Sequence, residues 1–218
     1  MPFATLLVPE SEKELYEHTG LEINTVPDEI IGLGPLRNWV LDNYKEHVII
    51  MADDDISHVW VNSRKKGVKI TDPETIFQLL VNTAQCAVDL RTSCFGFSQV
   101  WDVRKYNATE PFDLAGWVGG VIGVVGRDIR FVDHMFKVDV DFCLRVLMKD
   151  RILWKDNRFS FVQKRDKNLG GNSLFRTSER IEKELTYLEH RWGKYFKRRL
   201  SKAGEITNIR VKRKNDLL

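Results

Sequence analysis

The sequence predicts an α/β domain built around a mostly parallel central sheet with flanking helices, and three observations support this prediction. Its 218 residues are 43% hydrophobic and 30% charged, the composition of an ordinary globular domain that can bury a core. Strand-like and helical patterns alternate along the first half of the chain. One strand-like run, residues 48–52, is apolar throughout and leads directly into three consecutive aspartates.

The N-terminal part of the chain is predicted to contain three strands and one helix. Residues 3–8 and 21–26 each read as a short strand that stops at a proline. Pro35 suits the first position of a helix over residues 36–44, since its missing N–H costs nothing there. Residues 48–52 are rich in β-branched side chains and are typical of a strand covered on both faces.

Elements of both kinds continue through the middle of the chain. The patterns predict strands over residues 58–62, 94–100 and 158–163, a helix opened by the capping sequence at 71–74, and a helix over residues 139–149. Between them, residues 116–126 are apolar and rich in glycine, which indicates tight packing rather than a phosphate-binding loop.

The C-terminal end is predicted to be a long amphipathic helix over residues 178–200. We therefore expect a main domain over residues 1–176, with a helix and basic tail over residues 177–218 packed on it. Residues 191–214 contain ten Lys or Arg and a single acidic residue, in a chain of net charge +3. Four basic residues recur every three or four positions and would form a basic stripe along this helix, namely Arg191, Lys194, Arg198 and Lys202. Such a stripe can follow nucleic-acid phosphates, and a solvated helix face is the alternative.

The cysteine pattern and the hydropathy of the chain exclude several functional classes. The three cysteines form no CxxC pair or Cys/His cluster, so the sequence predicts neither a zinc site nor a disulfide framework. No apolar run approaches the roughly 18 residues of a membrane span, and the N-terminus lacks the features of a signal peptide. We therefore expect a cytoplasmic protein that does not bind membranes.

The three aspartates at residues 53–55 are the strongest candidate for a functional site. They follow a buried-type strand, and ligands of α/β proteins bind at the carboxyl ends of strands. In extended backbone, Asp53 and Asp55 project to the same side and Asp54 to the other. Two such carboxylates suit Mg²⁺ or Mn²⁺, which relieves their repulsion and completes its shell with phosphate oxygens. The alternatives are a solvated acidic loop and a phosphatase motif, which Ile56 disfavours.

Three segments of the chain resemble a known enzyme family. GPLRNWVLDNY, VIIMADDDI and KVDVDFCLRVLMKDRI are similar to GT-A glycosyltransferases, and most of all to the TET/JBP-associated DNA-modifying glycosyltransferases of tailed phages. The resemblance covers residues 3–175 and implies a GT-A (nucleotide-diphospho-sugar transferase) fold. It also implies a nucleotide-sugar donor, with a UDP-sugar as the first choice, and a bound Mn²⁺ or Mg²⁺.

The resemblance assigns a donor site to the residues around the triplet. Asp53 and Asp55 would bind the metal that holds the donor diphosphate. The residues that contact the nucleotide-sugar donor itself would be Pro9, Arg37, Asn38, Asp53 and Asp54. Many GT-A enzymes supply a later histidine as a further ligand, but residues 158–172 contain none, so the third ligand stays open.

The resemblance also implies a general base at the start of the helix over residues 139–149. Asp139 or Asp141 would take the proton from an acceptor hydroxyl in an inverting reaction. The glutamate that precedes the aspartate in the family is replaced by Val138. Helix capping is the alternative role, because aspartate favours the first turn of a helix.

The function that the resemblance implies is transfer of a sugar to the hydroxyl of a hydroxymethylated pyrimidine in DNA, in the cytoplasm of an infected bacterium. The basic end of the chain fits DNA as the acceptor. One alternative is a GT-A enzyme with a protein, lipid or saccharide acceptor, and another is a non-catalytic nucleic-acid-binding module. A metal-dependent nucleotidyltransferase or phosphatase is a weaker alternative.

Overall fold

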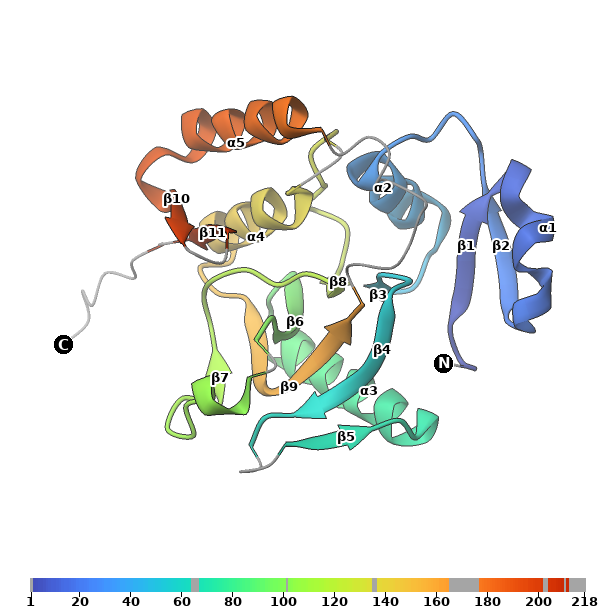
Figure 1. Ribbon diagram of the computed structural model, residues 1–218, viewed down its shortest axis with the longest axis horizontal. Helices are drawn as coiled ribbons and strands as arrows, with labels where there is room; N and C mark the ends of the chain where they lie inside the picture. Colours follow the sequence, from blue (N-terminus) through green and yellow to red (C-terminus); the bar gives the residue numbers. More distant parts are fainter. Residues whose placement is uncertain are drawn as a thin grey trace.

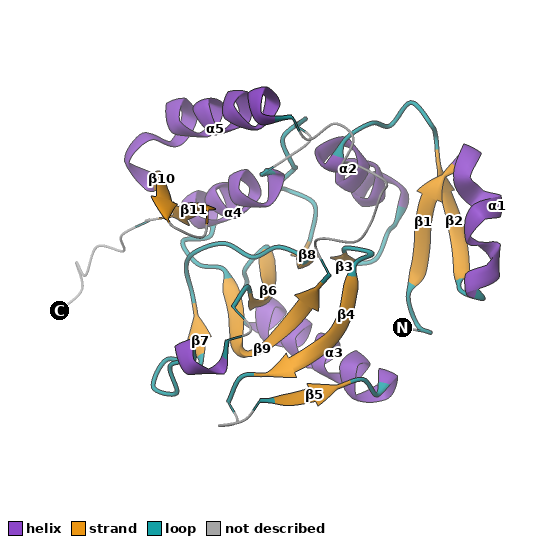
Figure 2. Ribbon diagram, in the orientation of Figure 1, coloured by secondary structure: helices purple, strands orange, loops and turns teal. Residues whose placement is uncertain are grey.

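The computed structural model shows a mixed α/β fold for the residues that it describes, which are 2–63, 67–100, 102–134, 137–164, 177–201, 204–209 and 211 (Figure 1). The α-helices in this part of the chain are α1 Lys13–Tyr16, α2 Leu33–Asn43, α3 Pro73–Asp89, α4 Val138–Lys149 and α5 Ser178–Trp192. The strands, which Figure 2 separates from the helices by colour, are β1 Thr5–Pro9, β2 Glu22–Val26, β3 Val48–Ala52, β4 Ile56–Val61, β5 Val68–Ile70, β6 Cys94–Ser98, β7 Phe112–Asp113, β8 Val121–Val125, β9 Trp154–Gln163, β10 Phe196–Ser201 and β11 Gly204–Ile209.

The main sheet is mixed and mostly antiparallel. Its strand order is β3-β8-β6-β9-β4-β5, with β7 beside β9. Among the described strands of this sheet, β6 and β9 run parallel and the other pairs are antiparallel. The α/β class is therefore confirmed, whereas the prediction of a mostly parallel sheet is wrong. Strand β8 lies between β3 and β6 and is antiparallel to both. The prediction failed because the apolar sequence of a buried strand does not indicate the direction of its neighbours.

The carboxyl ends of β3, β6 and β9 nevertheless lie at the same side of the sheet. Strand β8 is antiparallel to both β3 and β6, and β6 is parallel to β9, so β3, β6 and β9 share one direction. Residues 53–55 join β3 directly to β4, although three strands lie between these two in the sheet order. The sheet therefore curls, and the acidic triplet crosses at its carboxyl-end side.

Strand β3 lies at the edge of the main sheet, where its residues are exposed or only partly buried. The expectation of a strand covered on both faces is therefore wrong for residues 48–52. The strands that are covered on both faces are β6 and β8. An edge position leaves the end of β3 accessible to a ligand.

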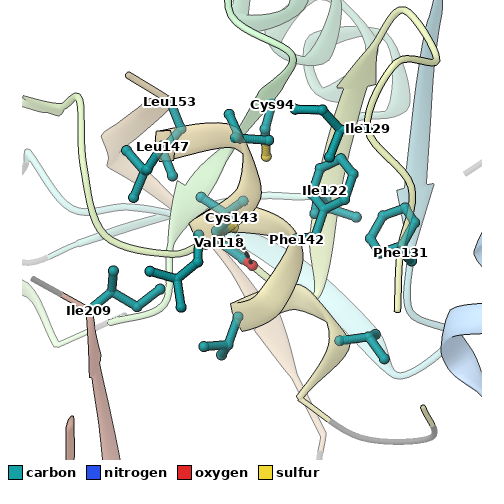
Figure 3. Packing of buried hydrophobic residues seen from close by; sticks show 14 of the residues in the cluster. Cys94, Val118, Ile122, Ile129, Phe131, Phe142, Cys143, Leu147, Leu153 and Ile209 are labelled. Atoms are coloured by element: carbon teal, nitrogen blue, oxygen red, sulfur yellow. Dashed lines mark hydrogen bonds between the residues drawn. The ribbon is translucent and has the colours of Figure 1, made fainter. Parts of the chain in front are cut away.

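Helices pack on both faces of the main sheet and divide the side chains of β6 and β8 between them. On one face, Phe95 and Phe97 pack with the α3 side chains Ile76, Leu80, Ala84 and Ala87. On the other face, Cys94 and Ile122 pack against α4 (Figure 3), whose contributing side chains include Phe142, Cys143 and Leu147. One close approach in this packing requires glycine. A Cβ at Gly123 would overlap the Phe95 ring, which explains this glycine of the segment over 116–126.

The N-terminal strands form a small unit of their own. Strands β1 and β2 pair in parallel, and with α1 they lie beside the main sheet at the right of Figure 1. Asn24 Nδ2 donates to the Tyr44 hydroxyl at 2.7 Å, and the Phe3 ring lies 5.0 Å from that of Phe77 on α3. These contacts connect the unit to α2 and α3.

The C-terminal helix is shorter than predicted. Helix α5 ends at Trp192, because Gly193 adopts a φ of +48°, a conformation that favours glycine. After a 3-10 turn over Gly193–Tyr195, the chain forms the antiparallel strands β10 and β11. Side chains from α5, β10 and β11 enter the same core as α4, namely Leu185, Leu188, Phe196 and Ile209.

Candidate active site

The backbone of the acidic triplet is anchored to the strands on either side of it. The Asp53 N–H donates to the carbonyl of Gly120 at 2.8 Å, just before β8. The Asp55 carbonyl accepts from the Lys164 N–H at 2.9 Å, just after β9. The triplet is therefore held between two strands of the main sheet rather than on a free loop.

The side chains of Asp53 and Asp55 lie side by side. Gln163 Nε2 donates to Asp53 Oδ2 at 2.7 Å and to Asp55 Oδ1 at 3.1 Å. Asp54 lies between them in a turn with its side chain exposed. The triplet therefore has the two-and-one division that the alternation of an extended backbone predicts.

Gln163 is fixed in this position by its own strand and by a glycine. It is the last residue of β9 and pairs in register with Ile56 of β4. Gly120 has a φ of +73°, and a Cβ there would come within 3.2 Å of the Gln163 amide. Gln163 is not among the predicted site residues, because a histidine is the ligand expected in this segment. Its one sequence signal is a polar residue at the carboxyl end of a predicted strand.

Arg37 lies buried beneath the triplet and connects it to α4. Its side chain is 4% exposed, forms an ion pair through Nη1 with Asp139 Oδ1, and approaches Asp53 Oδ1 through Nη2 at 3.7 Å. The guanidinium also lies over the Phe131 ring, 5.2 Å from its centroid. Burial lowers the pKa of Arg37, and the charge of Asp53 opposes this shift. A buried arginine thus joins two acidic motifs, Asp53–Asp55 and Asp139, that lie more than eighty residues apart in the sequence.

The pKa of Asp53 is set mainly by burial and then by the charges around it. Burial raises the pKa of this carboxyl above its ordinary value, and the neighbouring Asp55 and Asp54 carboxylates raise it further. Arg37 and the Gln163 amide act in the opposite direction without reversing the shift. Burial therefore favours the neutral form of Asp53 over the bare carboxylate.

Asp139 faces the same site from the first turn of α4. Its side chain is 18% exposed, and the oxygen that is not paired with Arg37, Oδ2, lies 2.9 Å from the position of a Cβ on Gly119. A side chain at Gly119 would crowd this carboxylate. We call Asp53, Asp55 and Asp139, together with Arg37 and Gln163, the acidic cluster.

Asn38 holds a neighbouring loop rather than facing the triplet. Its Nδ2 donates to the Phe131 carbonyl at 3.0 Å, and its Oδ1 accepts from the Phe131 N–H at 3.0 Å. Both ends of the amide are therefore engaged with one backbone unit. The Phe131 ring packs against the Arg37 guanidinium, so Asn38 supports the position of Arg37 through Phe131. A direct contact between Asn38 and the nucleotide sugar remains a prediction.

Asp141 lies outside the acidic cluster. It is fully buried, with Oδ2 accepting from Arg145 Nε at 2.5 Å and Oδ1 accepting from Trp192 Nε1 at 2.8 Å. Arg191 Nε lies 3.4 Å from the same Oδ1. We call these four residues the anchor cluster, because they attach the end of α5 to α4. The prediction of a base at Asp141 does not fit this burial, since an acceptor hydroxyl has no access to it.

Pro9 lies at the end of β1, in register with Val26 of β2. A link between this N-terminal unit and the triplet is Tyr16 of α1. Its pKa is raised by burial and by the negative charges of Glu12 and Asp54. The charge of Asp54 therefore acts on Tyr16, and a nucleotide contact by Pro9 remains a prediction.

The predicted basic stripe does not form, because the helix ends before most of its residues. Arg191 lies near the end of α5, Lys194 lies in the following 3-10 turn, and Arg198 lies on β10. Lys202 falls outside the described residues. A single helix face carrying all four residues is therefore wrong, and the reason is the turn at Gly193.

The charges of two of these residues are already paired within the protein. Arg191 contributes to the anchor cluster, and Arg198 pairs with Glu182 at 2.7 Å and with Glu189 at 3.0 Å. Lys194 is exposed, with its Nζ 5.1 Å from the centroid of the Tyr195 ring. Of the three residues that the structure describes, Lys194 is the one best placed to meet an anionic partner.

Metal binding by this site would depend on more than protein carboxylates. In the described part of the chain, no group of three or more His, Cys, Asp or Glu side chains is arranged to hold a metal ion. Asp53 and Asp55 supply two carboxylates, and a cation with two such ligands takes further oxygens from amides, water or phosphate.

Comparisons with known proteins identify one family. The model of the TET-Associated Glycosyltransferase family matches residues 3–171, which include every residue of the acidic cluster. No curated protein and no solved structure matches the chain. Among the described helices, none has the length and apolar character needed to cross a membrane.

Proposed function

We propose that this chain, which belongs to the TET-Associated Glycosyltransferase family, transfers a sugar from a nucleotide-sugar donor to a hydroxymethylated pyrimidine in DNA. The observation that carries the proposal is the acidic cluster at the carboxyl ends of β3, β6 and β9. There, Arg37 brings the Asp53–Asp55 pair and Asp139 together from separate segments. Two carboxylates for a cation beside a third for proton transfer are the set that a GT-A-type reaction needs.

Asp53 and Asp55 are the residues that would hold a Mn²⁺ or Mg²⁺ ion. Their fit to a cation is supported by two carboxylates that share the Gln163 amide in a partly buried site, where burial raises the pKa of Asp53 and the Asp55 and Asp54 carboxylates add to the rise. A bound divalent ion supplies charge stabilisation for the departing nucleoside diphosphate. The donor is thus expected at the edge of β3, and a UDP-sugar is our first choice.

Gln163 completes the proposed cation site. Its Nε2 now donates to both carboxylates, and half a turn of the amide replaces this donor by the oxygen Oε1. An amide oxygen is a suitable ligand for a hard cation, whereas an N–H group is not. Gln163 therefore has two roles in this proposal. Without the ion, its N–H group donates to both carboxylates, and with the ion, its oxygen becomes a third ligand.

Asp139 is the proposed general base. Arg37 holds Asp139 Oδ1, which leaves Oδ2 on the side of Gly119 to accept the proton of the acceptor hydroxyl. As the hydroxyl oxygen forms its bond to the anomeric carbon, the bond from that carbon to the diphosphate breaks, and the proton passes to Asp139. A direct displacement of this kind inverts the configuration of the sugar.

A donor and acceptor screen tests the proposed function. Purified protein is incubated with Mn²⁺ and a panel of nucleotide sugars, together with DNA that carries hydroxymethylated pyrimidines. Mass spectrometry of the DNA detects the added sugar. We expect transfer to hydroxymethylated DNA, none to unmodified DNA, and loss of transfer in excess chelator. Transfer to a protein, lipid or saccharide in place of DNA would contradict the proposed acceptor, and turnover in excess chelator would contradict the cation site.

A further inference from the structure

A cavity of about 440 Å³ is connected to the acidic cluster through Gly119, although no residue of the cluster lines it. Gln99 and Trp117 are part of its lining, and both contact Gly119. Gln99 Nε2 donates to the Gly119 carbonyl at 2.5 Å, and the Trp117 ring lies 3.1 Å from the position of a Cβ on Gly119. Asp139 Oδ2 lies 2.9 Å from that same position. A single glycine therefore separates the cavity from the proposed base.

The lining of this cavity combines aromatic rings with amide side chains. Trp117 and Tyr106 provide the rings, while Asn62, Gln99 and Asn157 provide the amides. Proteins that bind a single extruded base stack it on aromatic side chains and read its edge through hydrogen bonds. Amides carry both a donor and an acceptor, which matches the mixed hydrogen-bonding edge of a pyrimidine.

Asn62 provides an independent sign that the cavity binds a ligand. Its side chain is 3% exposed, and its Nδ2 donates to the Asn157 carbonyl at 2.9 Å and to Ser160 Oγ at 2.8 Å. Its Oδ1 is buried and has no hydrogen-bond partner among the described residues. Buried acceptors are rarely left unpaired, because the lost hydration is not replaced. A ligand N–H group that reaches Asn62 from the cavity would pair with this oxygen.

Charged residues complete the polar character of the cavity. Lys155 Nζ and Asp113 Oδ2 lie 2.5 Å apart, so the wall carries one cation and one anion in fixed positions. Lys105 also lines the cavity and is exposed. An exposed lysine at the cavity suits the phosphate next to a base that has left the duplex.

A larger cavity elsewhere in the protein lacks these features. It measures about 710 Å³ and lies between α3 and β9. Neither cavity has a residue of the acidic cluster in its lining, but the larger one also lacks Gln99 and Trp117, the two lining residues through which the smaller cavity contacts Gly119. Proximity to Asp139 distinguishes the smaller cavity.

We propose that the cavity beside Gly119 binds the acceptor pyrimidine, flipped out of the DNA, with its hydroxymethyl group directed toward Asp139 Oδ2. This inference rests on the proposed function and specifies where the acceptor binds. The volume of about 440 Å³ lies within the range of small-molecule sites and suits one nucleoside rather than a base pair. The target base must therefore leave the duplex to reach the base catalyst.

The test measures DNA binding and transfer by variants of the two aromatic walls. Tyr106→Ala removes an aromatic ring from a loop of the cavity wall. Trp117→Phe replaces the indole by the smaller phenyl ring and so keeps an aromatic side chain in place. Phe112→Ala is the matched control, because Phe112 lines the larger cavity. Fluorescence anisotropy gives the Kd for a dye-labelled duplex with one hydroxymethylated pyrimidine, and the transfer assay gives the KM for the same DNA. Thermal melting followed by circular dichroism verifies that each variant is folded.

We expect Tyr106→Ala to raise the Kd and the KM for DNA about five- to a hundred-fold, as for the loss of one base-stacking contact, with a smaller rise for Trp117→Phe. Phe112→Ala should leave both unchanged. Wild-type affinity in both wall variants, with transfer to DNA intact in the wild type, would overturn the cavity assignment and leave the proposed function standing. Donor hydrolysis by the wild type without transfer to any hydroxymethylated DNA would overturn the proposed function and this inference together.

Discussion

Asp139 and Asp141 lie two residues apart in the first turn of α4 and are both paired with arginine, yet their surroundings differ. Asp139 remains 18% exposed and pairs with Arg37 in the acidic cluster. Asp141 is fully buried and pairs with Arg145 in the anchor cluster. Residues of a helix turn by about 100° each, so side chains two apart leave it on nearly opposite faces.

In the proposed function, this difference separates the carboxylate that takes part in the reaction from the one that attaches α5. One face of α4 meets the carboxyl ends of the strands, where a substrate can reach the carboxylate. The other face meets the end of α5, where the carboxylate satisfies Trp192 Nε1 and two arginines. The same residue type in the same helical turn thus has two roles, and accessibility to a hydroxyl decides which one it takes.

The largest expected effect is the loss of turnover in variants of the acidic cluster. Asp53→Ala and Asp55→Ala should each reduce metal-dependent turnover by at least about a hundred-fold, because each removes a carboxylate from the proposed cation site. The measurement is release of nucleoside diphosphate in the presence of Mn²⁺. Asp42→Ala, which removes an exposed aspartate on α2, is the control and should retain turnover. Near-normal rates in both cluster variants would remove the cation site from the account.

On the anchor side, the expected effect is on stability. Asp141→Asn should lower the free energy of unfolding by up to about 3 kcal/mol, because it removes the charge of a fully buried acceptor whose partners Arg145 and Arg191 are 28% and 40% exposed. Urea denaturation of the variant and the wild type measures the difference. A loss below about 1 kcal/mol would show that the anchor cluster is not a buried charge network.

Trp192→Phe sharpens the same point with a smaller change. The substitution keeps an aromatic ring but removes the N–H that donates to Asp141 Oδ1 at 2.8 Å. The loss of a hydrogen bond to a charged group predicts a decrease of about 1.5–3 kcal/mol in the free energy of unfolding. The effect should become smaller when Trp192→Phe is introduced into Asp141→Asn, since the asparagine oxygen still accepts the indole N–H but carries no charge. Additive losses in the double variant would contradict this coupling.

Asp53→Asn should have the opposite sign of effect on stability. Burial raises the pKa of Asp53, which means that the folded protein favours its neutral form over the carboxylate. A neutral amide at this position should therefore raise the Tm in the presence of chelator at neutral pH. It should also abolish the increase in Tm that Mn²⁺ gives to the wild type. A lower Tm for the variant in chelator would show that the Arg37 contact outweighs the cost of burial.

The smallest effects are expected from the C-terminal basic residues. Arg198→Ala removes partly exposed ion pairs with Glu182 and Glu189 and should cost less than about 1 kcal/mol. Because its charge is already paired, it should weaken DNA binding less than Lys194→Ala. Titrations over a range of salt concentrations should show a slope reduced by about one for Lys194→Ala alone. An equal reduction of the salt-dependence slope in both variants would show that Arg198 also contacts DNA, as the predicted basic stripe requires.

The sequence was sufficient for those parts of the site that depend on local spacing. The alternation of an extended backbone predicted the pairing of Asp53 with Asp55, and the apolar run before them predicted β3 to the residue. Arg37 and Asp139 came from the family resemblance, and their contact has no local signature. Asp141 was misassigned because both aspartates fit the first turn of a helix, and only the packing of α5 shows which one is buried.

The remaining errors arise from tertiary structure. The direction of β8 and the edge position of β3 depend on which strands become neighbours, and apolar runs do not encode this. Gln163 reaches the triplet through its register with Ile56, which no pattern within β9 contains. The end of α5 had a local signal in Gly193, but the amphipathic pattern continued past it and masked the turn.

The most direct test of the account compares sugar transfer by Asp139→Asn and Asp141→Asn, each assayed with saturating donor at a temperature where it is folded. If Asp139 is the base, its variant should lose about 10²–10⁴-fold in kcat. Folded Asp141→Asn should stay within about threefold of the wild type, because its carboxylate serves the attachment of α5. A wild-type rate in Asp139→Asn, or an equal loss in folded Asp141→Asn, would contradict the division of roles between the two faces of α4.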